Sequence, residues 1–538
     1  MRIGTAGLFV SAAFALWPST RLLAGEAPLR HVTLLHIADT HAQLETHPEY
    51  MPGETGLPLM GGYARIKTAV DRERASAPAA TFFADGGDTF QGTAAAAWSR
   101  GEAVVAPLNA LGLDVCVPGN WEVVYGPAQL KHLTGELSCR VLAYNFHDTA
   151  TGQRLFAAST IIERGGVRVA FVGITDPTTS LRQPPDEVAG LDTTRMGGLR
   201  EYVRALHEKA DLVVAVTHTG LTISRQLARD IPEFDVILSG HTHERTQQAI
   251  LEGKVIVVEP GSMGSFLGRL DLTLGPGGVT EHRFRLIPLR ASEFAEDPMV
   301  KQKIDTSLAP YRARMAGLVG KSETPILRYD VLETSADDFI ADAVRAETHA
   351  DIAATNGFRF APPIPAGALT EGEMWLLLPL DARVKMGWVT GAELRAYLEN
   401  ELELVFSRNP QKLSGGWGPR LSGVSMRFQA GAPAGHRLRE LMVGGKKLDD
   451  AQHYTFAGCE RAGEPLDVVC RLRGVHDVKV TAQSIHALLD GYLAKHPEVA
   501  PVRDGRAVAT DLPARVFSQD AVIARLYGQN GDATAVRP

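Results

Sequence analysis

The chain has 538 residues, which is too long for one hydrophobic core, so two or more domains are expected. Hydrophobic residues make up 45% and charged residues 22%, which is the composition of a globular protein. The formal net charge of -7 and the lack of a long basic run argue against a nucleic acid polymer as the partner.

The first 25 residues have the pattern of a signal peptide. Arg2 gives a positive start, an apolar stretch covers residues 7–17, and the small residues Ala24 and Gly25 follow. The apolar stretch is too short to cross a membrane. We therefore expect export to the periplasm or beyond, with no stable membrane span. A membrane anchor and an ordinary buried N-terminal helix are the alternatives.

The chain contains four cysteines: Cys116, Cys139, Cys459 and Cys470. They do not form the dense framework of a disulfide scaffold, although export would permit a bridge within each pair. Cys116 lies in a predicted strand, and there we expect a small buried residue without a bridge.

Five β-prone runs in the first half of the chain each end in polar residues that bind metals. These runs and their endings are 31–38 with Asp39-Thr40-His41, 81–84 with Asp85-Gly86-Gly87-Asp88, 114–117 with Gly119-Asn120-Trp121-Glu122, 211–216 with Thr217-His218, and 235–238 with Gly240-His241-Thr242-His243. Helical stretches such as 63–76 separate them, which predicts a layered α/β domain. Because sites in such domains form at the carboxyl ends of strands, these side chains should meet at one edge.

Four further residues near these endings have simpler interpretations. We expect Asp85 to cap its turn and Glu122 either to orient Asn120 or to serve only the loop. Glu244 and Arg245 should be solvated or interdomain charges.

The C-terminal half has fewer signals. Strands are predicted at 270–274 and 282–289 around a glycine-rich turn, and residues 298–318 form an amphipathic helix that Pro310 should kink or divide. A helix start follows at Ser335, with acidic residues in its first turn. The tail from 516 to 538 supports no prediction.

The five-ending series resembles the calcineurin-like metallophosphoesterase domain as it occurs in the 5′-nucleotidase family, over residues 30–515. The resemblance implies an α/β fold. A four-layer α/β/β/α domain would span 30–292, a linker helix 293–322, and an α+β C-terminal substrate domain 323–515. In that family, rotation about the linker opens and closes the cleft.

The resemblance also implies a ligand set for two divalent metal ions. One ion would take Asp39, His41 and His243, the other Asn120, His218 and His241, and Asp88 would bridge both. Two ions held this way activate water near neutral pH. Nitrogen and oxygen ligands suit manganese, our first choice, as well as zinc or iron. Asn120, His218 and His241 are the predicted catalytic residues.

One motif departs from the family. Typical members read G-N-H-E-F-D, whereas Trp121 and Val124 replace the histidine and aspartate that stabilise or protonate the phosphate. A tryptophan here resembles the sulfur-oxidation thiosulfohydrolase branch, which releases sulfate from a cysteine thiosulfonate on a carrier protein. That branch typically has histidine where Asn120 stands, and it carries a long insertion after the first motif that this chain lacks.

Substrate contacts are expected from two glycine-rich loops of the second domain. The first resembles a shortened family loop, in which Asn356 would either hydrogen-bond the substrate or only hold the turn, and Arg359 would bind the substrate's anion. In the second, Trp417 and Arg420 would line the cleft. Residues 462–467 lack the aromatic that stacks on a nucleobase in nucleotidases, and Phe358 or Trp417 is the candidate substitute.

Together these features predict an exported dinuclear-metal hydrolase of small phosphomonoesters, either nucleotides or related metabolites. A thiosulfohydrolase acting on a sulfur-carrier protein is the first alternative, and a catalytically silent binding protein is the second.

Overall fold

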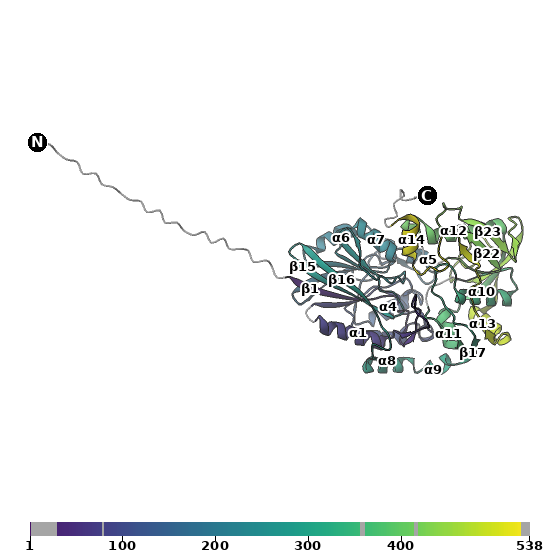
Figure 1. Ribbon diagram of the computed structural model, residues 1–538, viewed down its shortest axis with the longest axis horizontal. Coiled ribbons are helices and arrows are strands. Elements are labelled where there is room, and N and C mark those ends of the chain that lie inside the picture. Colours follow the sequence, from purple (N-terminus) through teal and green to yellow (C-terminus); the bar gives the residue numbers. More distant parts are fainter. Residues whose placement is uncertain (2–28, 78–79, 356–360, 414–417, 529–538) are drawn as a thin grey trace.

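A computed structural model describes residues 1, 29–77, 80–355, 361–413 and 418–528 (Figure 1). These residues form two α/β domains joined by a helical linker. Apart from Met1, the predicted signal peptide lies outside them. Among the described residues, no helix has the length and apolar character needed to cross a membrane.

Two six-stranded mixed sheets form the centre of the N-terminal domain. In spatial order, the first sheet contains β16 (Gly278–Pro288), β15 (Phe266–Gly275), β1 (Arg30–Ile37), β4 (Thr81–Asp85), β5 (Val115–Cys116) and β6 (Arg140–Val141). The second contains β13 (Ile250–Glu252), β14 (Val255–Val258), β12 (Val236–Ser239), β11 (Leu212–Thr217), β9 (Val167–Ile174) and β8 (Ser159–Arg164). The strands that carry the predicted site run parallel to one another: β1, β4 and β5 in one sheet, β11 and β12 in the other.

The two sheets pack face to face, with helices on both outer faces. Residues such as Leu34, Phe82, Phe171 and Val214 fill the space between the sheets. The outer helices are α1 (Tyr63–Ser76), α3 (Glu102–Asn109) and α8 (Pro298–Leu308) on the first sheet, and α6 (Leu199–Leu206) and α7 (Leu221–Asp230) on the second. Because both faces of β11 are covered, every residue of that strand is buried. The predicted α/β/β/α layering is confirmed.

Shorter elements complete this domain. They are β2 (His47–Pro48), β3 (Leu59–Met60), α2 (Ala94–Ser99), α4 (Pro127–Gly135), β7 (His147–Asp148), α5 (Thr179–Arg182) and β10 (Leu191–Asp192). The linker consists of α8 and α9 (Arg312–Met315), with Pro310 between them. The predicted division at that proline is therefore confirmed.

The C-terminal domain contains three sheets and five helices among its described residues. In spatial order, the first sheet contains β19 (Gly367–Thr370), β17 (Leu318–Ser322) and β27 (Glu498–Val499). The second contains β21 (Arg420–Ser422), β18 (Ile352–Thr355), β25 (His453–Cys459), β20 (Arg383–Thr390) and β26 (His476–Ser484). The third contains β24 (Lys446–Lys447), β23 (Leu438–Val443), β22 (Val424–Phe428) and β28 (Ala507–Ala509). The helices are α10 (Ser335–Thr348), α11 (Glu371–Leu377), α12 (Gly391–Phe406), α13 (Ile485–Lys495) and α14 (Gln519–Tyr527), with a 3-10 turn at Pro410–Lys412. Thr334 caps α10 by accepting from the backbone N of Asp337, so the predicted helix start is confirmed.

Helix α14 comes from the tail for which the sequence supported no prediction. Its Asp520 forms an ion pair with Arg225 of α7 at 3.0 Å, and the backbone N of Gln519 donates to Glu244 at 2.8 Å. Glu244 is buried, which confirms the interdomain interpretation of this charge. Helix α14 therefore connects the C-terminal domain to the N-terminal domain through these contacts.

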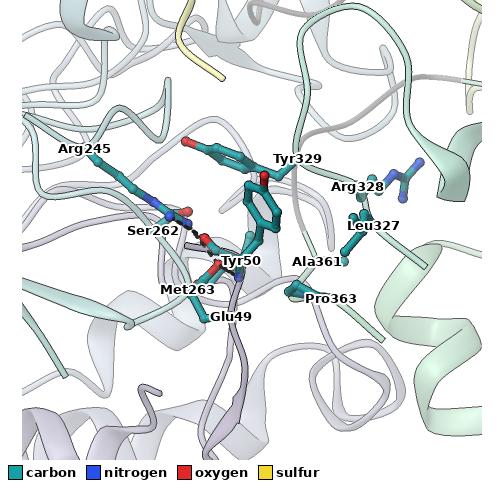
Figure 2. Close-up of a pocket in the computed structure, with 10 residues that line it drawn as sticks. All are labelled: Glu49, Tyr50, Arg245, Ser262, Met263, Leu327, Arg328, Tyr329, Ala361 and Pro363. Atoms are coloured by element: carbon teal, nitrogen blue, oxygen red, sulfur yellow. Dashed lines mark hydrogen bonds and ion pairs between the residues drawn. The ribbon is translucent and has the colours of Figure 1, made fainter. Parts of the chain in front are cut away.

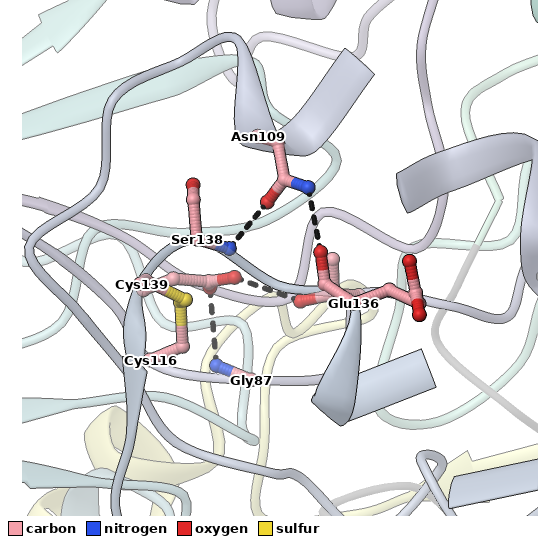
Figure 3. The surroundings of a disulfide bond; sticks show 8 residues. Gly87, Asn109, Cys116, Glu136, Ser138 and Cys139 are labelled. Carbon is pink, nitrogen blue, oxygen red and sulfur yellow. Dashed lines mark hydrogen bonds between the residues drawn. A yellow bond between two sulfur atoms is a disulfide. The ribbon is translucent and has the colours of Figure 1, made fainter. Parts of the chain in front are cut away.

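Cys116 and Cys139 form a disulfide, with their Cα atoms 6.1 Å apart (Figure 3). The expectation of an unbridged Cys116 was wrong. The reason is local: β6 pairs with β5 directly after Cys139, which brings that residue beside Cys116. Cys116 also pairs with Asp85 across β4 and β5, so the bridge lies next to the loop that carries Asp88.

Candidate metal centre

The predicted strand-end loops converge at one edge of the N-terminal domain. Asp39, His41 and His243 each offer a ligand atom, and these atoms lie within 4.8 Å of one another; Asp88, His218 and His241 form a second such group. His241 is partly exposed, and the other five residues are buried. The loops after β1 and β4 in one sheet and after β11 and β12 in the other thus build a single cluster.

Asp88 belongs to the second group and also faces the first. Its Oδ2 is 3.1 Å from His218 Nε2 and 3.9 Å from His41 Nε2. Its Oδ1 accepts a hydrogen bond from the backbone N of Trp121 at 2.8 Å. One oxygen is therefore fixed by the backbone while the other faces both imidazoles, as a bridging ligand requires.

The imidazoles are oriented by backbone carbonyls. His218 Nδ1 is 2.7 Å from Gly86 O and His41 Nδ1 is 3.1 Å from Gln91 O, which places a proton on each Nδ1. Each Nε2 is then the ring nitrogen left to bind a cation in the cluster. His41 Nε2 is only 3.1 Å from His243 Nε2, and two imidazole nitrogens that face each other in a buried site need a proton or a cation between them.

The donor set fits divalent cations. Each group combines one buried carboxylate with two imidazoles, and Asn120 Oδ1 adds an amide oxygen 3.1 Å from His218 Nε2. Such nitrogen and oxygen donors suit first-row transition metals.

The backbone of the cluster is strained. Asp39, His41, Asp88, His241 and His243 all have φ between 47° and 91°, in the left-handed region that residues other than glycine rarely adopt. Backbone strain of this kind costs roughly 1–3 kcal/mol per residue and persists where surrounding structure enforces it, commonly at functional sites. Five strained residues in one cluster are independent evidence that this edge is a functional site.

Burial and mutual charge set the protonation of the cluster. Burial lowers the pKa of His41 to about 4 and that of His241 to about 3, so both imidazoles are neutral, the form that binds metals. Burial raises the pKa of Asp39 to about 7, with the Asp88 charge adding to the effect. Although burial disfavours its charge, Asp88 has a pKa held below its usual range by His218 and His41. Bound cations would relieve this crowding of buried acids.

Two buried acidic residues hold the loops in place. Glu122 accepts from three backbone N–H groups, those of Gly119 at 2.6 Å, Thr89 at 2.6 Å and Asp88 at 3.1 Å. It therefore ties the Asn120 loop to the Asp88 loop, without contacting Asn120 through a described hydrogen bond. Asp85 accepts from Gly87 N and Thr89 Oγ1, which confirms its predicted turn-capping role.

Glu259 does the same for the loop that carries His241 and His243. It accepts from Ser239 Oγ at 2.7 Å, from Thr242 Oγ1 at 2.9 Å and from the backbone N of Glu244 at 2.9 Å. Sequence reasoning missed this residue, because a glutamate after an apolar strand carries no local signal of such a role.

Trp121 and Val124 stand where the related motif has a histidine and an aspartate. Both are buried and pack on Met263, and Leu380 of the C-terminal domain packs against the same cluster. The wall of the site beside Asn120 is therefore apolar.

A segment around α5 also reaches the site. Gln183 Nε2 donates to Asn120 O at 2.6 Å, and Arg182 pairs with Asp176. Burial is the main cause of the lowered pKa of His241, and the charges of Asp176 and Arg182 act on that pKa in opposite directions. These residues lie far from any motif in the sequence, and no pattern pointed to them.

A cavity between the domains adjoins the centre (Figure 2). Figure 2 shows Arg245 reaching into it beside Glu49, with the rings of Tyr50 and Tyr329 nearby. Tyr329 donates its hydroxyl to His243 O at 3.1 Å, and Met263 N donates to Asp39 O at 2.8 Å. The lining is thus connected directly to two predicted ligands.

None of the predicted substrate-contact residues is placed at the cleft by the described part of the structure. Asn356, Phe358, Arg359 and Trp417 lie outside the described residues. Arg420 does not line the cleft: it is 3% exposed, donates to Asp330 O at 2.6 Å and lies 3.4 Å from Asp337. The reason is that β21 begins at Arg420 and pairs with β18 inside the domain, which turns the guanidinium inward.

Two family models match the chain. Residues 32–245 match the calcineurin-like phosphoesterase model, and residues 318–459 match the 5′-nucleotidase C-terminal domain. Among curated relatives, a trifunctional nucleotide phosphoesterase protein of Bacillus subtilis is 26% identical over 77% of this chain, which spans only 30% of that relative's length. A 5′-nucleotidase of Vibrio cholerae is 25% identical over 80% of this chain and 85% of its own.

Solved structures give the same two-domain fold. The sulfate thiohydrolase SoxB of Thermus thermophilus, in complex with glycerol, superposes with a TM-score of 0.81 at 26% identity, covering 90% of this chain and 98% of that one. A 5′-nucleotidase precursor, also from Thermus thermophilus, gives a TM-score of 0.79 at 24% identity, covering 90% and 100%.

Proposed function

The chain belongs to the metal-dependent phosphoester hydrolases in which a calcineurin-like phosphoesterase domain precedes a 5′-nucleotidase C-terminal domain, and we propose that it releases phosphate from small phosphomonoesters such as nucleotides. The observation that carries this proposal is the convergence of two buried ligand groups around Asp88 on strained backbone.

We assign Asp39, His41 and His243 to one ion, Asn120, His218 and His241 to the other, and Asp88 to both. This assignment agrees with the two groups of facing ligand atoms and with the contact of Asn120 to His218. Divalent ions, with manganese as our first choice, would supply Lewis-acid activation of water and of the phosphoryl group.

The protein's own residues orient the substrate. With Oδ1 of Asn120 directed at the metal cluster, its amide Nδ2 donates to a phosphoryl oxygen, and Gln183 fixes the backbone of Asn120. The positive charge of Arg182, which acts on His241, would help to neutralise the negative charge that develops on the phosphoryl oxygens. Trp121 and Met263 exclude water from one side, which strengthens these electrostatic contacts.

We place the protein outside the cytoplasm. The N-terminal residues have the pattern of a signal peptide, and the Cys116–Cys139 disulfide is typical of oxidising compartments.

Hydrolysis of a cysteine thiosulfonate on a sulfur-carrier protein is the second candidate. Trp121 in the apolar wall favours it, as does the likeness to the sulfate thiohydrolase structure. Asn120 at the position where that branch has histidine favours the phosphoesterase.

The two candidates are separated by their products. Manganese-loaded protein is incubated with nucleoside monophosphates and an aryl phosphate, and in parallel with a peptide that carries a cysteine thiosulfonate. We expect phosphate release from the first set. Sulfate release alone would replace our proposal with the second candidate, and the absence of both products from fully loaded protein would favour a silent binding protein.

A further inference from the structure

Cys459 and Cys470 approach each other at the end of β25. Their Sγ atoms are 2.9 Å apart, and the backbone N of Cys470 donates to Cys459 O at 3.0 Å. A disulfide has an S–S bond of about 2.05 Å and needs its two Cα atoms close together, as a backbone hydrogen bond between the two residues ensures. The contact is closer than non-bonded sulfur atoms pack, so the bond requires only a small side-chain movement.

The neighbouring residues are adapted to this contact. At Gly458 a side chain would place its Cβ 2.8 Å from the Cβ of Cys470, so glycine is required for the close approach. Cys470 has a φ of 47°, which turns its side chain back towards β25. The hydrogen bond between the two thiols lowers the pKa of Cys459 and raises that of Cys470, and the nearby Arg461 and Arg471 also favour a Cys459 thiolate.

The loop between the two cysteines, residues 460–469, docks on the N-terminal domain. Arg461 donates to Arg182 O and forms an ion pair with Glu464 at 3.3 Å. At Gly463 a Cβ would lie 2.7 Å from Asp186 Oδ1, so the two backbones meet closely there. The segment that this loop contacts, residues 182–187, includes Gln183, whose side chain donates a hydrogen bond to the backbone O of Asn120. The loop therefore contacts the segment that supports the metal centre.

We propose that Cys459 and Cys470 form a second disulfide, and that this bond fixes the loop 460–469 in the conformation that docks on residues 182–187. Closing a short loop covalently removes most of its alternative conformations. The docked state thereby gains population without any new contact at the domain interface.

Formation of the bond removes two protons and two electrons from the thiols, and a small-molecule disulfide such as oxidised glutathione accepts the electrons. The Cys459 thiolate attacks one sulfur of the oxidant and one glutathione thiolate leaves. The Cys470 thiolate then attacks Cys459 Sγ, the mixed disulfide breaks, and the second glutathione leaves reduced.

The bond is tested by thiol mapping. Protein equilibrated with oxidised glutathione is unfolded in denaturant, treated with iodoacetamide, digested and analysed by mass spectrometry. We expect a linked peptide pair containing Cys459 and Cys470 and no alkylated cysteine. Alkylation of both these residues, with Cys116 and Cys139 protected as the internal control, would overturn the proposal.

The docking is tested by hydrogen exchange in oxidised wild type and in the double variant Cys459→Ser/Cys470→Ser. Faster exchange of residues 182–187 in the variant is expected, and equal exchange would refute the docking role. This readout needs no enzyme activity, so it stays decisive even if the proposed function fails. A second expectation rests on the proposed function: the variant should show a severalfold higher KM for the phosphomonoester.

Discussion

Glu122→Gln tests how the centre is held together. The carboxylate accepts from Gly119 and Asp88 through Oε2 and from Thr89 through Oε1. A glutamine retains only one acceptor oxygen, so its NH2 group must face at least one backbone N–H. A buried N–H without an acceptor costs about 1–3 kcal/mol. We expect the unfolding free energy of the metal-free protein to fall by roughly that amount.

The same change should weaken metal binding. The two loops that Glu122 joins carry Asn120 and Asp88, and loss of a residue that orients metal ligands typically lowers metal affinity about 10–100-fold. The assay is a manganese titration of the metal-free variant, with chelator competition to extend the range, alongside thermal unfolding. Turnover at saturating manganese should stay near the wild-type value, because Glu122 orients ligands and takes no part in the chemistry.

The matched control is Glu163→Gln, an exposed glutamate on β8. It should change neither the melting temperature nor the metal affinity. Unchanged manganese affinity in Glu122→Gln would refute the positioning role, and lost turnover at saturating manganese would show that Glu122 acts in the reaction itself.

Three further predictions concern the metal, the apolar wall and pH. Dialysis against a chelator should abolish phosphate release, and manganese should restore it; activity that survives with no metal detected would contradict the proposed chemistry. The double variant Trp121→His/Val124→Asp introduces an acid–base pair beside Asn120. It should raise kcat for nucleoside monophosphates about tenfold or more. A decrease in kcat would show that the apolar wall is needed for the native reaction. Burial raises the pKa of Asp338 to about 9. The same carboxyl in the unfolded chain releases its proton at roughly pH 4, so the stability of the folded protein should fall as the pH rises from about 4 towards 9. Asp338→Asn should therefore flatten the dependence of the melting temperature on pH. An unchanged dependence would refute the raised pKa.

The ligand series was predictable because every ligand lies in the short polar loop that follows an apolar run. Parallel strands present their carboxyl ends at one edge, so Asp39, Asp88 and His241 had to meet once the fold was recognised. The alternation of strands and helices predicted a layered α/β domain, and the family resemblance added the four-layer α/β/β/α arrangement.

The remaining features depend on contacts between distant segments. Glu122 stands in a predicted motif, but its contacts with the Asp88 loop could not be read from it, and Glu259, which accepts from Glu244 N, lies in no pattern that reveals its role. Cys116 is bridged because β6 pairs beside it, and a strand of two residues is too short to predict. Arg420 follows a glycine-rich loop, but the pairing of β21 with β18 buries it. Such placements are decided by tertiary packing.

The central claim is that Asp88 joins two metal ions into one hydrolytic centre. The most direct test measures bound metal per chain together with phosphate release in wild type and in Asp88→Asn. Asparagine tolerates the left-handed backbone at this position and still accepts from Trp121 N, so the change removes the bridging oxygen and its charge while keeping the loop. Asp71→Asn, exposed on α1, is the control. We predict two ions per wild-type chain and fewer in Asp88→Asn, with turnover reduced about 100-fold or more. A fully loaded, fully active Asp88→Asn protein would contradict the account.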